Sequence, residues 1–255
     1  GSAAKYIAAS TKEVIRDAEG LTYKKNMITI MEIMGRNAGW LTGATALSKS
    51  EDCEGPDLIY LPEVPFDIEK FLAKVKDLLK KKSSVVIAVS EGIKLADGRY
   101  VCELGSSGDY VDAFGHKQLA GTATYLANFL AAECGCKTRA VELSTLQRSA
   151  SHMASRVDIN EAFMVGGAAV KAADEGDSGK MVVIDRVSDD PYMSAAGIYD
   201  VHKIANNEKT VPRAWLNETA DYVTEEFINY IEPLIQGDYP PFMVNGLPQH
   251  LVLKK

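Results

Sequence analysis

Apolar residues recur along the chain with two different spacings, and each spacing predicts a different element. Residues 3–18 follow the 3.6-residue period of a helix. Short apolar runs then follow at residues 28–33, 58–61 and 85–89. Runs of this length and composition are typical of strands that are buried on both faces of a parallel sheet.

Helical patterns at residues 38–49 and 67–82 lie between these runs. The resulting alternation of helix and strand predicts a three-layer α/β fold, because parallel strands need crossover helices. A glycine-rich stretch at 93–115 interrupts the alternation before a helical pattern at 117–134 and a strand at 139–143. Long irregular stretches inside a domain commonly lie over a functional site.

The pattern changes after Leu143, where a polar turn begins. A helix is expected over residues 159–173, a strand over 180–186 and a closing helix over 218–235. Gly166-Gly167 within the first of these predicts a close contact with another helix. We interpret the change as passage into a second lobe.

Composition narrows the classes of function. The 255 residues carry a net charge of −7, which argues against general binding of nucleic acid or anionic membranes, so any anionic ligand must be held by local arginines. No apolar stretch reaches the roughly 18 residues of a membrane span, and the first residues lack a signal-peptide core, so a cytoplasmic protein is expected. The four cysteines match no zinc spacing and are expected to be reduced thiols.

The junction Met34-Gly35-Arg36 is the first candidate for ligand chemistry. It ends a predicted strand and opens a helix, so a glycine there allows close backbone approach and the helix presents unpaired N–H groups. Arg36 adds a planar guanidinium that can bind an anion through two hydrogen bonds. Many strand–helix turns, however, carry a glycine and an arginine for structural reasons alone.

Glu91 lies two residues after the apolar run 85–89 and is followed by Gly92. In open α/β sheets this carboxyl edge is where ligands lie, and a carboxylate there suits the hydroxyls of a sugar better than a phosphate. The alternative is that Glu91 caps the next turn.

Arg139 and Arg148 flank a predicted strand and its exit turn. Together with Arg36 they would provide three guanidinium groups, enough to neutralise a phosphoryl group. The alternative is that Arg139 is a surface residue and that Arg148 pairs with Asp158 or Glu142. His116 and His152 lie at no triad or metal spacing, so structural roles are expected.

Several strings, taken in order, resemble the phosphofructokinase family over nearly the whole chain. They are M-G-R-N-A-G-W, L-P-E, V-S-E-G, F-G-H-K-Q-L-A-G, T-R-A-V-E-L-S-T-L-Q-R and S-R-V-D-I-N-E-A. The N-A-G-W extension and the P-L-I-Q-G ending are similar to the bacterial branch that uses pyrophosphate. The resemblance implies a parallel-sheet, phosphofructokinase-like fold.

The resemblance also implies a fructose 6-phosphate site in a glycolytic phosphotransferase, made by Met34, Gly35, Arg36, Glu91, Arg139, Thr145 and Arg148. Arg139 and Arg148 would bind the 6-phosphate, one of them from a neighbouring subunit of a homo-oligomer. Thr145 stands where many ATP-using members carry histidine, and Met27 stands where they carry arginine before the strand.

The family's glycine-rich donor loop and its T-I-D-N-D segment, which supplies the aspartate base and the Mg²⁺ site, are expected upstream of Gly1. We therefore expect residues 1–145 to form the sugar-phosphate lobe, 146–215 to return to the donor lobe and 216–255 to form a C-terminal helix and tail. No catalytic residue is expected in the chain, which should be inactive alone. Pyrophosphate is the favoured donor, with an ATP-dependent enzyme or a non-catalytic sugar-phosphate-binding subunit as alternatives.

Overall fold

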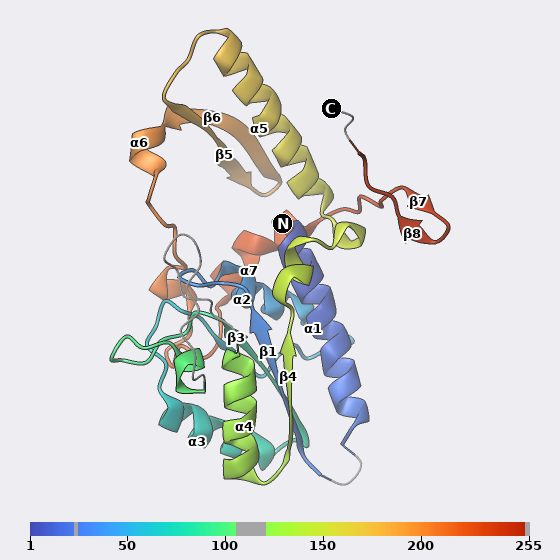
Figure 1. The fold of residues 1–255 in the computed structure, drawn as a ribbon, viewed down its shortest axis with the longest axis vertical. Coiled ribbons are helices and arrows are strands. Elements are labelled where there is room, and N and C mark those ends of the chain that lie inside the picture. Colours follow the sequence, from blue (N-terminus) through green and yellow to red (C-terminus); the bar gives the residue numbers. More distant parts are fainter. Residues whose placement is uncertain (23–24, 106–120, 253–255) are drawn as a thin grey trace. The chain divides into compact units, whose positions relative to one another are not determined.

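A four-stranded parallel sheet organises the larger part of the chain (Figure 1). The computed structural model describes residues 1–22, 25–105 and 121–252. Its helices and strands, in order, are α1 (Ser2–Gly20), β1 (Met27–Ile33), α2 (Trp40–Gly43), β2 (Leu58–Tyr60), α3 (Ile68–Leu79), β3 (Ser84–Ser90), α4 (Thr122–Cys134), β4 (Lys137–Glu142), α5 (Arg156–Asp174), β5 (Lys180–Asp189), β6 (Tyr192–Asp200), α6 (Val201–Ile204), α7 (Glu225–Ile231), β7 (Met243–Val244) and β8 (Leu247–Pro248). None of the described helices combines the length and the apolar content that crossing a lipid bilayer requires.

The chain divides into two units, which are described separately. The sheet unit contains Ile7–Gln147 and Thr210–Ile228, and the hairpin unit contains Gly1–Tyr6, Arg148–Lys209 and Asn229–Lys255. The division into segments 1–145, 146–215 and 216–255 that the resemblance implies concerns a whole enzyme and stays a prediction.

The sheet has the strand order β2-β3-β1-β4, with every pair parallel. All seven residues of β1 are buried, as are six of the seven in β3, which is the pattern of central strands covered on both faces. The α/β prediction is therefore confirmed, and the predicted runs 28–33, 58–61 and 85–89 are its strands.

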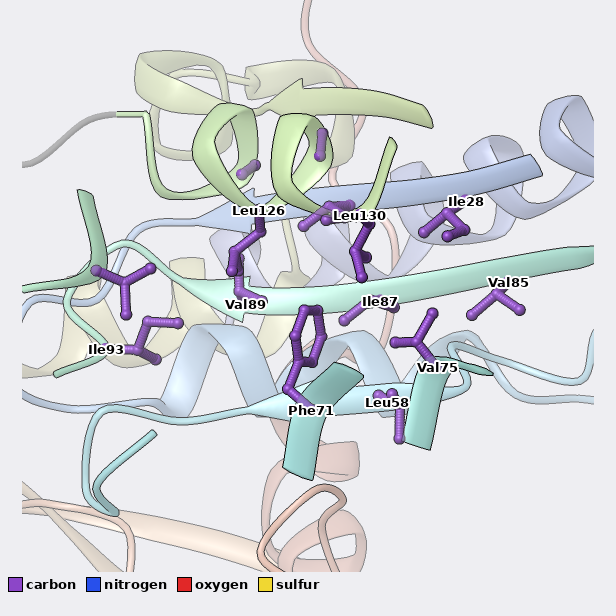
Figure 2. Close-up of a cluster of buried hydrophobic side chains, with 14 of the residues drawn as sticks. Ile28, Leu58, Phe71, Val75, Val85, Ile87, Val89, Ile93, Leu126 and Leu130 are labelled. Atoms are coloured by element: carbon purple, nitrogen blue, oxygen red, sulfur yellow. The ribbon is translucent and has the colours of Figure 1, made fainter. Parts of the chain in front are cut away.

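One face of the sheet packs against α3 and α4 (Figure 2). Phe71 projects from α3 toward the middle strand β3, and Leu126 and Leu130 reach the same strand from α4. Phe71, Ile87 and Leu126 are fully buried, so this layer is a well-packed core.

The pattern at residues 38–49 predicts a single helix, and this prediction is wrong. The structure has the single turn α2 followed by a 3₁₀ helix at Ala44–Ser48. The hydroxyls of Thr45 and Ser48 each donate 2.7 Å hydrogen bonds to the carbonyl three residues earlier, a local bond that competes with a regular α-helix. A Cβ on Gly43 would lie 2.3 Å from the ring of Phe227. The change from α-helix to 3₁₀ helix therefore falls where Phe227 of α7 packs against the Gly43 backbone.

The closing helix is shorter than predicted, because α7 begins at Glu225 rather than Glu218. Asn217 and Asp221 instead close a loop on each other: the Asn217 side-chain amide donates to Asp221 (2.7 Å), and the Asp221 N–H donates back to Asn217 (3.0 Å). Side chains of this type favour turns over helix interiors.

The hairpin unit contains a strand that the sequence pattern did not reveal. β5 confirms the strand expected at 180–186, and it pairs antiparallel with β6. Gly166 and Gly167 lie in the helix α5, but a Cβ at either position would meet no atom within 4 Å in the described structure. The predicted close contact with another helix is thus not made within the described residues.

We expect Phe71→Ala to lower the free energy of unfolding of the sheet unit by about 3–5 kcal/mol, because it removes a fully buried ring and leaves a cavity. Phe163→Ala is the control, since that side chain is 84% exposed, and it should change stability by less than about 0.5 kcal/mol. Urea denaturation of both variants measures the difference. Equal effects would contradict the assignment of the core.

Candidate functional site

The turn after β1 lies between the ends of the adjacent strands β1 and β3, after which the chain continues into different helices. β1 and β3 pair in register up to their last residues, Ile33 and Ser90. The chain after β1 enters α2, which contacts β2 and β3 but is not part of the core cluster, whereas the chain after β3 leads to α4 within that cluster. In open α/β sheets such a point at the carboxyl edge is where ligands bind.

Hydrogen bonds hold the turn against the end of β3. The Gly35 N–H donates to Glu91 Oε1 (3.3 Å), and the Gly92 N–H donates to the Gly35 carbonyl (3.2 Å). The Ser90 hydroxyl donates to the same carbonyl. The structure therefore brings Gly35 and Glu91 together, and the backbone of the turn is fixed on one side.

Glycine is required twice at this contact. A Cβ on Gly92 would lie 1.8 Å from the Arg36 carbonyl oxygen, and a Cβ on Gly35 would lie 2.7 Å from the Ala38 carbonyl oxygen. Contacts this short do not occur for real side chains, so Gly92 allows the two chain segments to meet and Gly35 allows the turn to close on itself. The close approach expected from Gly35 is found, and Gly92 makes a closer one.

Gln147 is a site residue that sequence reasoning missed. Its side-chain oxygen accepts a hydrogen bond from the Met34 N–H (3.1 Å), and its amide nitrogen donates to the Ser144 carbonyl (2.9 Å). The side chain is only 2% exposed. Its place directly before the candidate Arg148 was the one hint in the sequence, and its burial and its hydrogen bonds are seen only in the structure.

The other predicted site residues do not all lie at the turn. Arg36 and Glu91 are half-buried at the turn, and Thr145 is exposed on a 3₁₀ helix, Ser144–Arg148. Arg148 is exposed and belongs to the hairpin unit, whose second segment it begins, so its approach to the turn stays a prediction. Within the described residues Arg148 makes no ion pair. Asp158, a suggested partner, instead accepts from the Ser2 N–H (2.9 Å).

Arg139 does not reach the turn within one chain. Its guanidinium pairs with Asp17 of α1 at 2.5 Å, and its backbone is in register with Thr29, five residues before Met34. At about 3.3 Å per residue, this places it roughly 16 Å from the turn along the strand direction. Within a single chain Arg139 is therefore a surface residue, as the alternative interpretation expected. It could bind the phosphate only at the site of a second copy.

Glu32 is a buried carboxyl beside the site. It is 6% exposed, its Oε2 accepts from the Ala123 N–H in the first turn of α4 (2.8 Å), and it is in register with Glu142. The pKa of Glu32 is raised to about 7, chiefly by burial and to a smaller extent by the nearby Glu142 and Glu91 carboxylates, while the hydrogen bond from Ala123 opposes the rise.

Metal and histidine chemistry find no support in the described part of the chain. No group of three His, Cys, Asp or Glu side chains is placed there to hold a metal ion. His152 packs edge-on against Tyr6 with ring centroids 6.1 Å apart, which agrees with a structural role. His116 lies outside the described residues.

We expect the stability of the chain to fall as the pH rises from about 4.5 to 7, in part because of Glu32. Its pKa is raised on folding, so unfolding releases a proton in this window and the ionised form disfavours the folded state. Comparison of the wild type with Glu32→Gln by urea denaturation at pH 4 and pH 8 should show the difference between them shifting by roughly 3 kcal/mol in favour of the variant. Parallel pH profiles would show that Glu32 does not titrate in this way.

We expect Gly92→Ala to displace the turn, because a methyl group cannot fit against the Arg36 carbonyl. The free energy of unfolding should fall by more than about 2 kcal/mol. Gly166→Ala is the matched control: it lies in a helix with open space around it, and alanine there should stabilise by roughly 0.5–1 kcal/mol. If Gly92→Ala is tolerated as well as the control, the contact is not as close as described.

Comparison with known proteins adds to this geometry. The family model for phosphofructokinase matches residues 1–173. The chain is 40% identical over 256 residues to the pyrophosphate–fructose 6-phosphate 1-phosphotransferase of Halomonas elongata, covering all of this chain and 60% of that protein. Crystal structures of pyrophosphate-dependent phosphofructokinases from Nitrosospira multiformis and Marinobacter aquaeolei superpose with TM-scores of 0.85 and 0.83, at 34% and 32% identity, over 99% of this chain and 60% of each.

The chain thus spans about 60% of the length of the relatives that it matches. The family resemblance, including the similarity to the bacterial pyrophosphate-dependent branch, is confirmed by relatives that extend over the whole chain. This chain belongs to the phosphofructokinase family.

Proposed function

We propose that the chain carries the fructose 6-phosphate site of a phosphotransferase that forms fructose 1,6-bisphosphate with pyrophosphate as donor. The observation that supports this most is the joining of the turn Met34–Arg36 to Glu91 at the carboxyl ends of β1 and β3. The reaction and the donor are those of the relatives, which are pyrophosphate–fructose 6-phosphate 1-phosphotransferases.

The turn offers both kinds of contact that a sugar phosphate needs. Arg36 stands on a backbone held by Gly92, so its guanidinium can bind an anion with little loss of conformational entropy. Glu91 accepts a hydrogen bond from the Gly35 N–H, which fixes its carboxylate at the turn, and a carboxylate is an acceptor that suits sugar hydroxyls.

The chain's share of the reaction is alignment. In-line phosphoryl transfer requires that the acceptor hydroxyl be oriented, that charge on the moving group be neutralised and that a base receive the proton. Arg36 and Glu91 would hold fructose 6-phosphate so that its 1-hydroxyl faces a donor. The family's Mg²⁺ does not fit the described residues, which contain no suitable ligand cluster, and we derive no step through it.

A shared site in a homo-oligomer would give Arg139 a role. This arginine lies on β4, the edge strand of the sheet, with 47% of its side chain exposed. An exposed cation away from the turn of its own chain can contact the phosphate held by another copy. We propose the same phosphate as the ligand of Arg148, with Thr145 beside it.

Residues 146–215 are proposed to belong to the lobe that binds the phosphate donor. In the hairpin unit, Phe163 and Val170 are one heptad apart on α5 and are 84% and 72% exposed. Gly166 and Gly167 lie between them with open space above. An apolar face with small residues at its centre suits the close packing of another element, which the remaining 40% of a relative's length can provide.

Calorimetry with fructose 6-phosphate tests the binding function directly. The chain should bind it more tightly than fructose, and show negligible turnover by itself with pyrophosphate or ATP. A whole enzyme that contains this chain should use pyrophosphate in preference to ATP. Turnover with ATP alone would favour the ATP-dependent alternative, binding without turnover in any assembly would favour a non-catalytic subunit, and equal affinity for fructose would contradict a phosphate site.

We expect Arg148→Ala in the whole enzyme to weaken sugar-phosphate binding by roughly 2–4 kcal/mol, as for the loss of a charge-assisted contact to a buried anion. Lys81→Ala is the control: Lys81 is exposed in the C-terminal turn after α3, and exposed charges contribute little. Steady-state kinetics measure both. An unchanged Michaelis constant for the sugar in Arg148→Ala would remove this residue from the site.

A further inference from the structure

We propose that Glu63 is a positioning residue for the turn that carries Arg36. The structural part of this inference stands on the hydrogen bonds of Glu63, and its consequence for fructose 6-phosphate rests on the proposed function. Glu63 follows β2, so it lies at the carboxyl edge of the sheet, but it belongs neither to the turn nor to the strands that flank it.

One oxygen of Glu63 holds two distant segments together. Oε1 accepts from the N–H of Gly39 and from the N–H of Val211, each at 2.8 Å. Gly39 ends the turn and is the residue before α2, and Val211 is the second residue of Thr210–Ile228, the segment that returns to the sheet unit. Hydrogen bonds to an ionised carboxylate are stronger than those between neutral groups, so this oxygen fixes the end of the turn.

The other oxygen of Glu63 is enclosed. Oε2 is buried and has no hydrogen-bond partner among the described residues. A Cβ on Gly39 would lie 2.9 Å from Oε2 and 2.8 Å from the Leu61 side chain, so the carboxylate packs directly against the glycine. A buried oxygen without a partner is a cost to stability. Costs of this kind are characteristic of places where a group must be held in one position.

Arg36 therefore stands between two fixed points of the backbone. Gly92 and Ser90 hold the start of the turn, at Gly35 and Arg36, and Glu63 holds its end, at Gly39. With only three residues between Gly35 and Gly39, loss of the second point frees the backbone on one side of Arg36. The entropy of ordering that backbone would then oppose ligand binding.

The chain contains its own reporter of this contact. Its two tryptophans are Trp40, directly after Gly39, and Trp215, four residues after Val211. The Trp40 ring stacks on Phe227 with centroids 5.8 Å apart and meets Trp215 edge-on at 6.0 Å. Because both segments that Glu63 joins enter this cluster, intrinsic fluorescence reports on the contact without any ligand.

The test compares Glu63→Ala and Glu63→Gln with the control Asp67→Ala. Gln keeps an oxygen that can accept from both N–H groups, whereas Ala removes it. Asp67 also accepts two backbone N–H bonds, from Glu69 and Lys70 at 3.1 and 3.0 Å, but at the start of α3 and away from the turn. Each variant is measured by tryptophan emission and by calorimetry with fructose 6-phosphate.

We expect Glu63→Ala to shift the emission to longer wavelength and to raise the dissociation constant by roughly 10- to 100-fold, the equivalent of one or two lost charge-assisted bonds. Glu63→Gln should keep the wild-type emission and most of the affinity. Asp67→Ala should lose only stability. If Glu63→Ala fails to fold, Glu63→Asp serves instead, because the same charge on a shorter side chain cannot reach both N–H groups.

The proposal is overturned if the Glu63 variants match Asp67→Ala, with unchanged emission and affinity, or if Gln restores neither signal. A wild type that does not bind fructose 6-phosphate at all would contradict the proposed function instead. In that event the emission of the Ala and Gln variants still decides whether Glu63 fixes the turn.

Discussion

The contact between the Gly92 backbone and the Arg36 carbonyl is the constraint on which the candidate site depends. Two chain segments that leave neighbouring strands meet there without an intervening side chain. Because the strands are buried and paired to their last residues, the segments have no freedom to separate. The backbone of Arg36 is thus held by main-chain packing, which is how a rigid scaffold prepares a binding group in advance.

Buried and half-buried carboxylates serve the same purpose around this edge of the sheet. Glu32 lies in β1, Glu91 directly follows β3 and Glu63 lies three residues after β2, and each accepts at least one hydrogen bond from the backbone N–H of another segment. The charged group favours these N–H bonds, while its burial is unfavourable, as the raised pKa of Glu32 shows. The loops are therefore ordered at some cost to stability.

Much of the fold could be predicted from the sequence, because buried parallel strands have a distinctive composition. The runs at 28–33 and 85–89 are nearly all apolar, and they became β1 and β3. The single helix predicted at 38–49 was wrong because tertiary contacts prevailed over the local pattern. The α-helix ends at Gly43, whose backbone packs against the ring of Phe227, a residue far along the chain. β6 was missed because its alternation is weak and its partner strand is exposed to solvent.

The site was predictable to a smaller extent. Gly35 and Glu91 carry motif signals and lie together as expected, whereas Gln147 and Glu63 act through backbone N–H groups that no local pattern identifies. For Arg139 the residue type was informative but the position was not: an arginine suits a phosphate, yet its register on β4 places it beside Asp17. Residue type indicates chemistry, while register and packing decide where that chemistry lies.

The discontinuous make-up of the sheet unit has a consequence during synthesis. Its core strands are complete by residue 147, but Phe227, which fills the space over Gly43, and Val211, which binds Glu63, arrive only after the segment Arg148–Lys209 of the hairpin unit has been translated. A nascent chain must therefore keep a half-covered sheet accessible for more than sixty residues of elongation, about 3–12 s at usual ribosome speeds. During that interval the exposed apolar surface is a natural target for chaperones.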